Sequence, residues 1–352
     1  MGLYHPVTAG GLVLPGNLFL APVAGCSDWI FRSICAEAGA DFTFTELVSA
    51  ESLIRAPPGG RRPDGSFHPV HELLRRGKNE TPYAVQLFGA DPRRMYEAAA
   101  LLAPWKPDMV DINGGCPVPK VTKTGAGSAL MRDPANLGRV VEAVVRASRE
   151  HLGAAPVSLK IRSGWDDSSV NYAECARIAA KAGASMVSLH PRTRAQGYGG
   201  RSRWDHITDL VSRIDLPVTG SGDLYTPEDA GSMLRETGCA AVMFARGAMG
   251  NPFIFTAARS LLVTGSYTVP GPAARAGAAF RQLEILAGEI GERAACIRMR
   301  KQFCACTKGS MGAPGMAGGA VLRNALVHAE SIEEYRNLFQ NSNYAAAISE
   351  QE

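Results

Sequence analysis

Short apolar runs recur eight times in the first 250 residues of this 352-residue chain, and each is followed by a helical pattern. The runs are Leu18–Ala21, Phe42–Phe44, Tyr83–Leu87, Met109–Ile112, Val157–Ile161, Met186–Leu189, Pro217–Thr219 and Ala241–Phe244. Strands that alternate with helices pair in parallel through right-handed connections. Eight such units predict an α/β fold, a (β/α)8 TIM barrel, which places its active site at the C-terminal ends of the strands.

Polar residues occur where these predicted strands end. Gln86 lies in the third run, Asn113 follows the fourth, Lys160 lies in the fifth and His190 ends the sixth. Because side chains alternate along a strand, Leu159 is expected to face the helices while Lys160 faces the lumen. The sequence therefore predicts that these polar groups converge on one mouth of the barrel.

A tight loop after the fourth run presents a thiol. Its sequence is Asn113-Gly114-Gly115-Cys116-Pro117, in which the glycines allow backbone angles closed to other residues and the proline fixes the exit. Cys116 is therefore the candidate reactive group, and the alternative is a buried apolar thiol. No His, Asp or Asn forms a nucleophile's motif around it, so a general acid is at least as well supported as a nucleophile.

The loops after the last two runs are candidates for binding a phosphate. They are Gly220-Ser221-Gly222-Asp223 and Ala245-Arg246-Gly247-Ala248. In TIM barrels the loops after strands seven and eight often bind a phosphate through backbone N–H groups. Two ordinary turns are the simpler interpretation, but the paired position favours a phosphate site with charge from Arg246.

Lys160 and His190 each have two interpretations. A lysine in a barrel mouth is costly unless it meets an anion or an acceptor, so Lys160 is predicted to contact an electron-rich ring or a phosphate. The alternative is an ion pair with Glu46 or Asp111. His190 begins a basic loop, which favours a neutral donor beside an anionic ligand, whereas alone it would be a hydrogen-bonded structural residue.

The remainder of the chain predicts a second, smaller domain. Residues 1–264 are assigned to the barrel, and a linker rich in Gly, Pro and Ala precedes helical patterns over residues 275–345. Residues 292–323 carry six basic residues against Glu292 alone, and a second basic loop runs from Arg192 to Arg203 without an acid. These stretches indicate an anionic partner or, alternatively, two solvated charged surfaces. Residues 53–80 are predicted to be a mobile surface insertion.

Composition narrows the class of protein. The net charge is +4, and no apolar run approaches the roughly 20 residues that span a bilayer, so a cytoplasmic protein is expected. Its eight cysteines are expected to be reduced thiols. The spacing of Cys304-Ala305-Cys306 is wrong for a zinc pair, so no metal site is predicted. Nothing in the sequence indicates a protein partner, and a monomer is expected.

Several segments together resemble the bacterial tRNA-dihydrouridine synthases. They are Ala21–Gly25, Gln86–Gly89, Asp111–Pro117, Lys120-Val121, Ala126–Leu130, Leu159–Trp165 and His190–Arg194. The resemblance spans the barrel and continues at Arg298-Met299-Arg300-Lys301. The Asn-x-Gly-Cys-Pro motif is highly specific when it is combined with Lys-Ile-Arg-x-Gly-Trp.

The resemblance implies an FMN enzyme that uses NADPH to reduce the 5,6 double bond of selected uridines in tRNA. Cys116 would donate a proton to carbon 5 of the uracil while the reduced flavin delivers hydride to carbon 6. The residues expected to bind the cofactor are Pro22, Val23, Ala24, Gln86, Asn113, Lys160, His190, Ser221, Gly222, Asp223, Ala245 and Arg246. The residues expected to bind RNA are Arg192, Arg194, Arg298, Arg300 and Lys301.

Three positions depart from the family's usual residues, which are Asn at Ser221, Gly at Ala245 and Met at Gly114. None of these changes removes a catalytic group. Two other functions remain as alternatives: an FMN-dependent barrel oxidoreductase acting on a small pyrimidine-like substrate, and a non-catalytic RNA-binding protein that kept the barrel. The basic helical tail counts against the first alternative, and the intact Cys116 and Lys160 count against the second.

Overall fold

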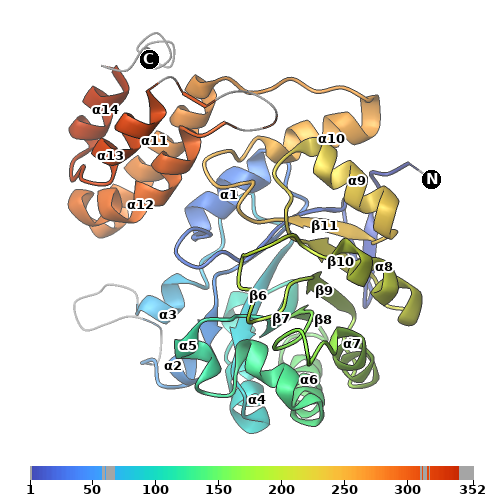
Figure 1. Cartoon of the computed structure of the whole chain (residues 1–352). Coiled ribbons are helices and arrows are strands. Elements are labelled where there is room, and N and C mark those ends of the chain that lie inside the picture. Colours follow the sequence, from blue (N-terminus) through green and yellow to red (C-terminus); the bar gives the residue numbers. More distant parts are fainter. Residues whose placement is uncertain are drawn as a thin grey trace.

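The computed structural model describes residues 2–57, 60, 68–309, 311, 315–316 and 318–340, and it contains the predicted barrel (Figure 1). Eight parallel strands form it, and the pairing of β4 with β6 closes the ring. The strands are β3 (Leu18–Leu20), β4 (Phe42–Phe44), β6 (Tyr83–Phe88), β7 (Met109–Gly114), β8 (Val157–Arg162), β9 (Met186–His190), β10 (Val218–Ser221) and β11 (Ala241–Phe244). All eight predicted strands are confirmed; the short β5 (Val48–Ser49) also pairs with β6.

Helices lie outside the ring between successive strands. They are α1 (Trp29–Glu37), α2 (Ala50–Ile54), α3 (Pro69–Glu72), α4 (Pro92–Ala100), α5 (Pro119–Thr122), α6 (Pro134–His151), α7 (Tyr172–Lys181), α8 (Trp204–Arg213), α9 (Pro227–Thr237) and α10 (Ile254–Thr264), with the 3-10 segments η2 (Ala103–Trp105) and η3 (Gly127–Arg132). The side chains of Asp91, Asp133 and Thr226 cap α4, α6 and α9, each followed by a proline in the first turn.

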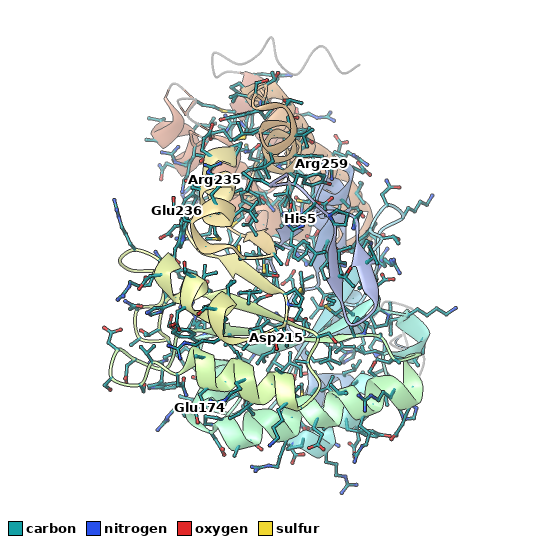
Figure 2. The ribbon with its side chains drawn as sticks, turned by 90° about the vertical axis from the view of Figure 1, so that its right-hand side faces the viewer. His5, Glu174, Asp215, Arg235, Glu236 and Arg259 are labelled. Atoms are coloured by element: carbon teal, nitrogen blue, oxygen red, sulfur yellow. The ribbon has the colours of Figure 1, made fainter. Side chains whose placement is uncertain are left out.

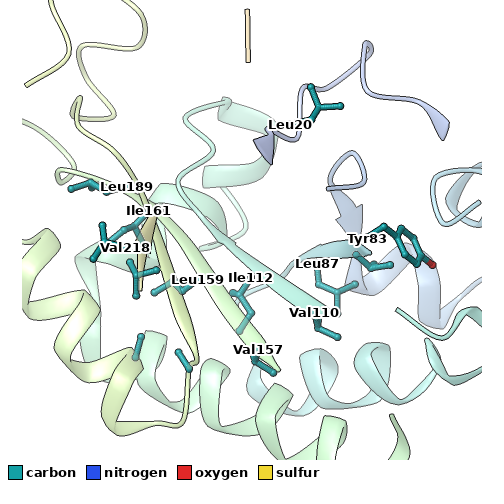
Figure 3. Close-up of a cluster of buried hydrophobic side chains, with 14 of the residues drawn as sticks. Leu20, Tyr83, Leu87, Val110, Ile112, Val157, Leu159, Ile161, Leu189 and Val218 are labelled. Atoms are coloured by element: carbon teal, nitrogen blue, oxygen red, sulfur yellow. The ribbon is translucent and has the colours of Figure 1, made fainter. Parts of the chain in front are cut away.

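Strand residues alternate between two environments, as the sequence predicts. Ile112, Leu159 and Leu189 point outward into the cluster between the strands and the helices (Figure 3). Their neighbours point into the lumen, where the Ser158 hydroxyl donates to the Asp111 carboxylate at 2.5 Å. The lumen is therefore polar towards the mouth, which is where the strands end.

An N-terminal hairpin that the sequence analysis did not identify covers the other end of the barrel. It consists of β1 (Val7–Ala9) and β2 (Leu12–Leu14), joined by Gly10 and Gly11, both with positive φ. Its side chains pack with lumen residues of the opposite strand ends, among them Phe19 and Met186. The signal was present, because two glycines between short apolar runs are typical of a two-residue hairpin turn.

Contacts of Tyr4 with Asp41 and Arg259 hold the start of the chain against the outer wall. Arg259 of α10 and His5 are labelled on the same side of the molecule in Figure 2. The Arg259 guanidinium lies 2.7 Å from Asp41 and 5.1 Å over the Tyr4 ring, and the Tyr4 hydroxyl donates to Asp41. Burial is the main cause that raises the pKa of Tyr4 to about 12.

In the described part of the chain, four further helices follow the barrel and pack beside α1 (Figure 1). They are α11 (Pro272–Ile290), α12 (Glu292–Cys306), α13 (Gly319–Leu326) and α14 (Ile332–Gln340). Helix α11 begins before the predicted limit at 275, because Pro272 can occupy its first turn after Gly271. The predicted limit at 345 lies outside the described residues.

Helix α1 belongs to both parts of the molecule. Phe31 and Cys35 pack in the barrel cluster, whereas Ile30 and Ile34 pack in the cluster of the helical domain. The insertion predicted over 53–80 contains the end of α2 and all of α3, and its residues 58–59 and 61–67 lie outside the described residues.

Candidate active site

A cavity opens at the C-terminal ends of the barrel strands. Most of the predicted site residues line it: Pro22, Val23, Ala24, Asn113, Cys116, Lys160, His190, Ser221, Gly222, Asp223, Ala245 and Arg246. Gln86 instead lies fully buried below it, where its amide donates to Asp111 at 2.6 Å and accepts from Asn113 at 2.8 Å. The predicted residues therefore gather at one cavity, except Gln86, which connects to it through Asn113.

Hydrogen bonds within the loop and from η3 hold the segment that carries Cys116. The Asn113 side chain accepts from the Cys116 N–H at 2.8 Å, and the Cys116 carbonyl accepts from Ser128. Gly127 has a φ of +62°, and a Cβ there would lie 2.7 Å from the Cys116 carbonyl oxygen. This close approach requires glycine and holds the thiol at the cavity wall.

The electrostatics keep the Cys116 thiol protonated at neutral pH. Burial raises its pKa, and the Val118 N–H and the charges of Arg162 and Lys160 oppose part of that rise. A protonated thiol can donate a proton, and the same cations can stabilise the thiolate that forms.

Lys160 is buried between the cation Arg162 and the acidic groups of Asp111 and Cys116. Burial, and after it the charge of Arg162, lower the pKa of Lys160 to about 8, although Asp111 and Cys116 oppose the change. Among the described residues it forms no ion pair with Glu46 or Asp111. Burial raises the pKa of Asp111 to about 6, although hydrogen bonds from Gln86 and Ser158 stabilise its charged form. Lys160 therefore offers a positive charge to a ligand in the cavity.

The two loops predicted to bind phosphate pack directly on one another. Gly222 has a φ of +104°, and a Cβ there would lie 2.2 Å from the Ser202 hydroxyl. A Cβ on Gly247 would lie 2.3 Å from the Leu224 carbonyl, so both contacts require glycine. Within the described part of the chain, the N–H groups of Gly222, Asp223, Arg246 and Gly247 have no hydrogen-bond partner. Free N–H groups beside an arginine suit an anion such as a phosphate.

His190 is held neutral at the same cavity. Burial and the charges of Lys160, Arg162, Arg192 and Arg246 lower its pKa well below the usual range. Its Nε2 lies 3.3 Å from the Arg192 guanidinium. The imidazole is uncharged at neutral pH, which the expected role as a neutral donor requires.

Arg162, Tyr198 and Tyr225 also line the cavity, and none of them was among the residues predicted from the sequence. Arg162 donates to the Gly115 carbonyl at 2.9 Å and thus fixes the loop beside the thiol. It lies two residues after Lys160, so strand alternation could have identified it. Tyr198 and Tyr225 are 62% and 41% exposed at the rim, where the Arg246 guanidinium lies 5.0 and 5.3 Å from their rings.

The arginines predicted to bind RNA in the loop after β9 lie in different environments. The Arg192 side chain is 2% exposed, and its guanidinium binds the Asp223 carboxylate at 2.8 Å and the Gly199 carbonyl at 3.1 Å. Arg194 lies 4.6 Å from the Trp165 ring and is partly exposed. Arg192 therefore supports the Gly222–Asp223 loop from inside, and Arg194 faces outward.

The three basic residues predicted on α12 have different surroundings. The Arg298 guanidinium lies 3.8 Å from Asp28 and 3.6 Å from Glu46. The Arg300 guanidinium reaches the Ala329 carbonyl at 3.5 Å within the helical domain. Lys301 is exposed, and a Cβ on Gly25 would lie 3.6 Å from its ammonium nitrogen. Of the three, Lys301 is the one that extends freely over the rim.

None of the helices in the described ranges has the length and apolar character needed to cross a membrane. The same ranges contain no group of three or more His, Cys, Asp and Glu side chains placed to bind a metal ion.

The family model for dihydrouridine synthases (Dus) matches residues 19–350. A probable tRNA-dihydrouridine synthase of Treponema pallidum is 47% identical over 97% of this chain and 97% of its own length. Probable tRNA-dihydrouridine synthase 1 of Synechocystis is 34% identical over 96% of this chain and 89% of its own. The tRNA-dihydrouridine synthase B of Pseudomonas aeruginosa is 35% identical over 76% of each chain.

Solved structures with a similar fold are more distant. An old yellow enzyme homologue from Zymomonas mobilis matches with a TM-score of 0.52 at 13% identity, over 76% of this chain and 94% of that chain. A 2-naphthoyl-CoA reductase matches with a TM-score of 0.55 at 12% identity, over 72% and 51%. Such identities establish the barrel fold alone, whereas the match over residues 19–350 and the full-length relatives establish the family. This chain belongs to the dihydrouridine synthase family, flavin-dependent oxidoreductases that reduce uridine in tRNA.

Proposed function

We propose that this protein reduces the 5,6 double bond of particular uridines in tRNA, as a cytoplasmic monomer with FMN as its flavin and NADPH as its reductant. The observation that carries the proposal is one cavity that combines the protonated Cys116 thiol, the Lys160 ammonium and the free N–H groups beside Arg246. The names of the full-length relatives support tRNA as the substrate.

The residues present fit FMN. The N–H groups of Gly222, Asp223, Arg246 and Gly247 would hold its phosphate, since they have no partner among the described residues. Lys160 would bind the ring, and the short segment Pro22–Ala24 would form one wall of its site. Bound FMN, reduced by NADPH, supplies the hydride that is added to carbon 6 of the uracil.

Cys116 supplies the proton that completes the reduction. Hydride addition at carbon 6 leaves excess electron density at carbon 5, and the thiol of Cys116 donates its proton there. The S–H bond breaks as the C–H bond forms, which leaves a thiolate beside the positive charges of Arg162 and Lys160. The thiolate recovers a proton from water before the next cycle.

The substrate base has to leave its stack to reach the cavity, and cations around the mouth would bind the neighbouring phosphates. Arg194 and Lys301 are the proposed contacts, whereas Arg300 reaches the Ala329 carbonyl within the helical domain. Arg192 and Arg298 are charged partners of carboxylates within the protein, and we reassign both to positioning roles.

The test compares Cys116→Ala with Cys304→Ala, a partly buried thiol of α12 that lies away from the cavity. Single-turnover reduction of unmodified tRNA by the FMN-loaded, NADPH-reduced enzyme should slow by about 10²- to 10⁴-fold in Cys116→Ala, the usual contribution of a general acid. Cys304→Ala should retain the normal rate. NADPH oxidation without tRNA should be equal in both variants.

A normal rate of tRNA reduction by Cys116→Ala would remove the proton-donor role. Reduction of free uridine at the rate seen with tRNA would favour the small-substrate alternative. Protein that binds no FMN in a fluorescence titration would contradict the cofactor assignment.

A further inference from the structure

Three loops after neighbouring strands meet at one indole ring. The Arg132 guanidinium carbon lies 4.9 Å from the Trp165 ring centre, and that of Arg194 lies 4.6 Å from it. Arg132 ends η3 after β7, Trp165 follows β8, and Arg194 follows β9. We call these three residues the Trp165 platform. By the sum of the two distances, its guanidinium carbons lie within about 9.5 Å of one another.

The platform holds two positive charges without a carboxylate partner. Within the described ranges, no ion pair or side-chain hydrogen bond involves Arg132 or Arg194, and the Arg194 Nε is buried without a hydrogen-bond partner. Two cations this close repel one another, and the face of the indole only partly compensates. An arrangement of this kind is stable beside an anion and has donors free to bind it.

The surroundings extend the positive surface towards the thiol. Helix α5 packs against η3 and carries Lys120, and Lys123 follows it; both side chains are exposed. Val118, between these lysines and Cys116, is 50% exposed. A chain of phosphates that crosses the platform would therefore pass directly beside the cavity.

The platform lies across the mouth from the helical domain. In the closed ring, β8 is four strands from β3, so the two are opposite one another. Lys301 reaches the loop after β3 from α12, whereas Trp165 follows β8. The cavity with Cys116 is thus flanked by positive charge on both sides.

From this geometry we propose that the Trp165 platform binds the phosphate backbone of the RNA strand next to the target uridine. The proposal rests on the proposed function and specifies where the barrel itself holds its tRNA. Arg132 and Arg194 bind phosphates, and the indole is the ring that orients both guanidinium groups. Lys301 binds the same RNA from the opposite side, which holds the strand across the cavity while one base enters it.

The test measures tRNA affinity of the FMN-loaded protein by fluorescence anisotropy at several salt concentrations. Arg132→Gln and Arg194→Gln should each lower the slope of log affinity against log salt by about 0.7 to 0.9, the value for one lost phosphate contact, and the double variant by about twice that. Arg149→Gln, at the far end of α6, removes an equal charge away from the mouth and should leave the slope unchanged.

Two conservative variants separate binding from folding. Arg132→Lys should keep the slope, because a point charge still pairs with a phosphate. Trp165→Leu should weaken tRNA binding while the thermal unfolding temperature and the FMN affinity stay normal. Unchanged slopes in both arginine variants, in an enzyme that still reduces tRNA uridine, would overturn the platform and leave the proposed function standing. Failure of the unaltered protein to bind or reduce tRNA would overturn the proposed function.

Discussion

The arginines on the two sides of the barrel mouth differ in whether a carboxylate lies beside them. On the side of the helical domain, Arg298 lies beside Asp28 and Glu46, and Arg32 pairs with Glu80 in a fully buried contact. On the Trp165 platform, no carboxylate among the described residues pairs with an arginine. The first side uses Arg32 and Arg298 to join parts of the protein, and the second leaves Arg132 and Arg194 available to a ligand. The carboxylate neighbours, rather than the number of arginines, distinguish a docking surface from a binding surface.

The largest expected effect comes from removing a carboxylate on the docking side. Glu80→Ala leaves the fully buried Arg32 without its counter-charge and Thr43 without its acceptor at 2.6 Å. The free energy of unfolding should fall by about 3–5 kcal/mol, the usual cost of breaking a buried ion pair. Urea denaturation measures the change. A loss below about 1 kcal/mol would mean that water already screens this pair.

Lys160, on the floor of the cavity, tests the cost of an unpaired cation. Its pKa is about 8 in the protein against 10.5 as the ordinary value. A depressed lysine pKa contributes stability that is present above 10.5 and lost as the pH falls through 8. FMN-free protein should therefore lose stability over that interval, by roughly 3 kcal/mol at about 1.4 kcal/mol per pKa unit.

The control for this prediction is Lys160→Met, which removes the titrating group. Between pH 10.5 and 7, thermal unfolding of the variant should not show the decrease in stability that the unaltered protein shows. Identical pH dependence in the two proteins would show that Lys160 already has a partner for its charge.

Glu46 tests how the docking side supports the flavin site. Its carboxylate accepts from the Gly25 N–H at 2.6 Å and pairs with Arg298, and burial raises its pKa. Glu46→Ala frees the loop that includes Pro22, Val23 and Ala24, so FMN should bind about 10-fold more weakly, since a hydrogen bond to a charged group contributes roughly 1.5 kcal/mol. Fluorescence titration measures it. Glu46→Gln can still accept a hydrogen bond from the Gly25 N–H, so it should lose less FMN affinity than Glu46→Ala. An equal loss of FMN affinity in both variants would assign the effect to the charge of Glu46 alone.

The smallest expected effect comes from an exposed pair on the docking side. Arg281 of α11 binds Glu37 of α1 at 2.9 Å, with side chains 53% and 30% exposed. A double-mutant cycle should give a coupling of about 0.2–1 kcal/mol, since solvent screens the pair. A coupling near that of a buried pair would contradict the distinction between buried and exposed docking contacts.

The sequence predicted the barrel because the apolar runs carry the period of the strands. It predicted Lys160 and His190 at the mouth for the same reason, since alternation decides which side chain enters the lumen. It did not show that Gln86 stops one layer below the cavity. The depth of Gln86 depends on the length of its side chain relative to the side chain of Asn113, which donates a hydrogen bond to it from the cavity side.

The roles of the arginines were harder to predict, because they depend on contacts between distant segments. Arg192 and Arg194 are two residues apart in one basic loop, yet one is buried against Asp223 and the other rests on Trp165. Arg298 meets Glu46 from more than 250 residues further along the chain. Charge runs in a sequence carry no information about such partners.

The two faces of α1 determine how the molecule unfolds. Ile30 and Ile34 fill the core of the helical domain, and Phe31 and Cys35, one residue along in each case, fill the core of the barrel. Neither part can release this helix without exposing apolar side chains of the other. The barrel and the helical domain should therefore unfold together in a single thermal transition. The boundary between them separates two functions, and it does not separate two independently stable units.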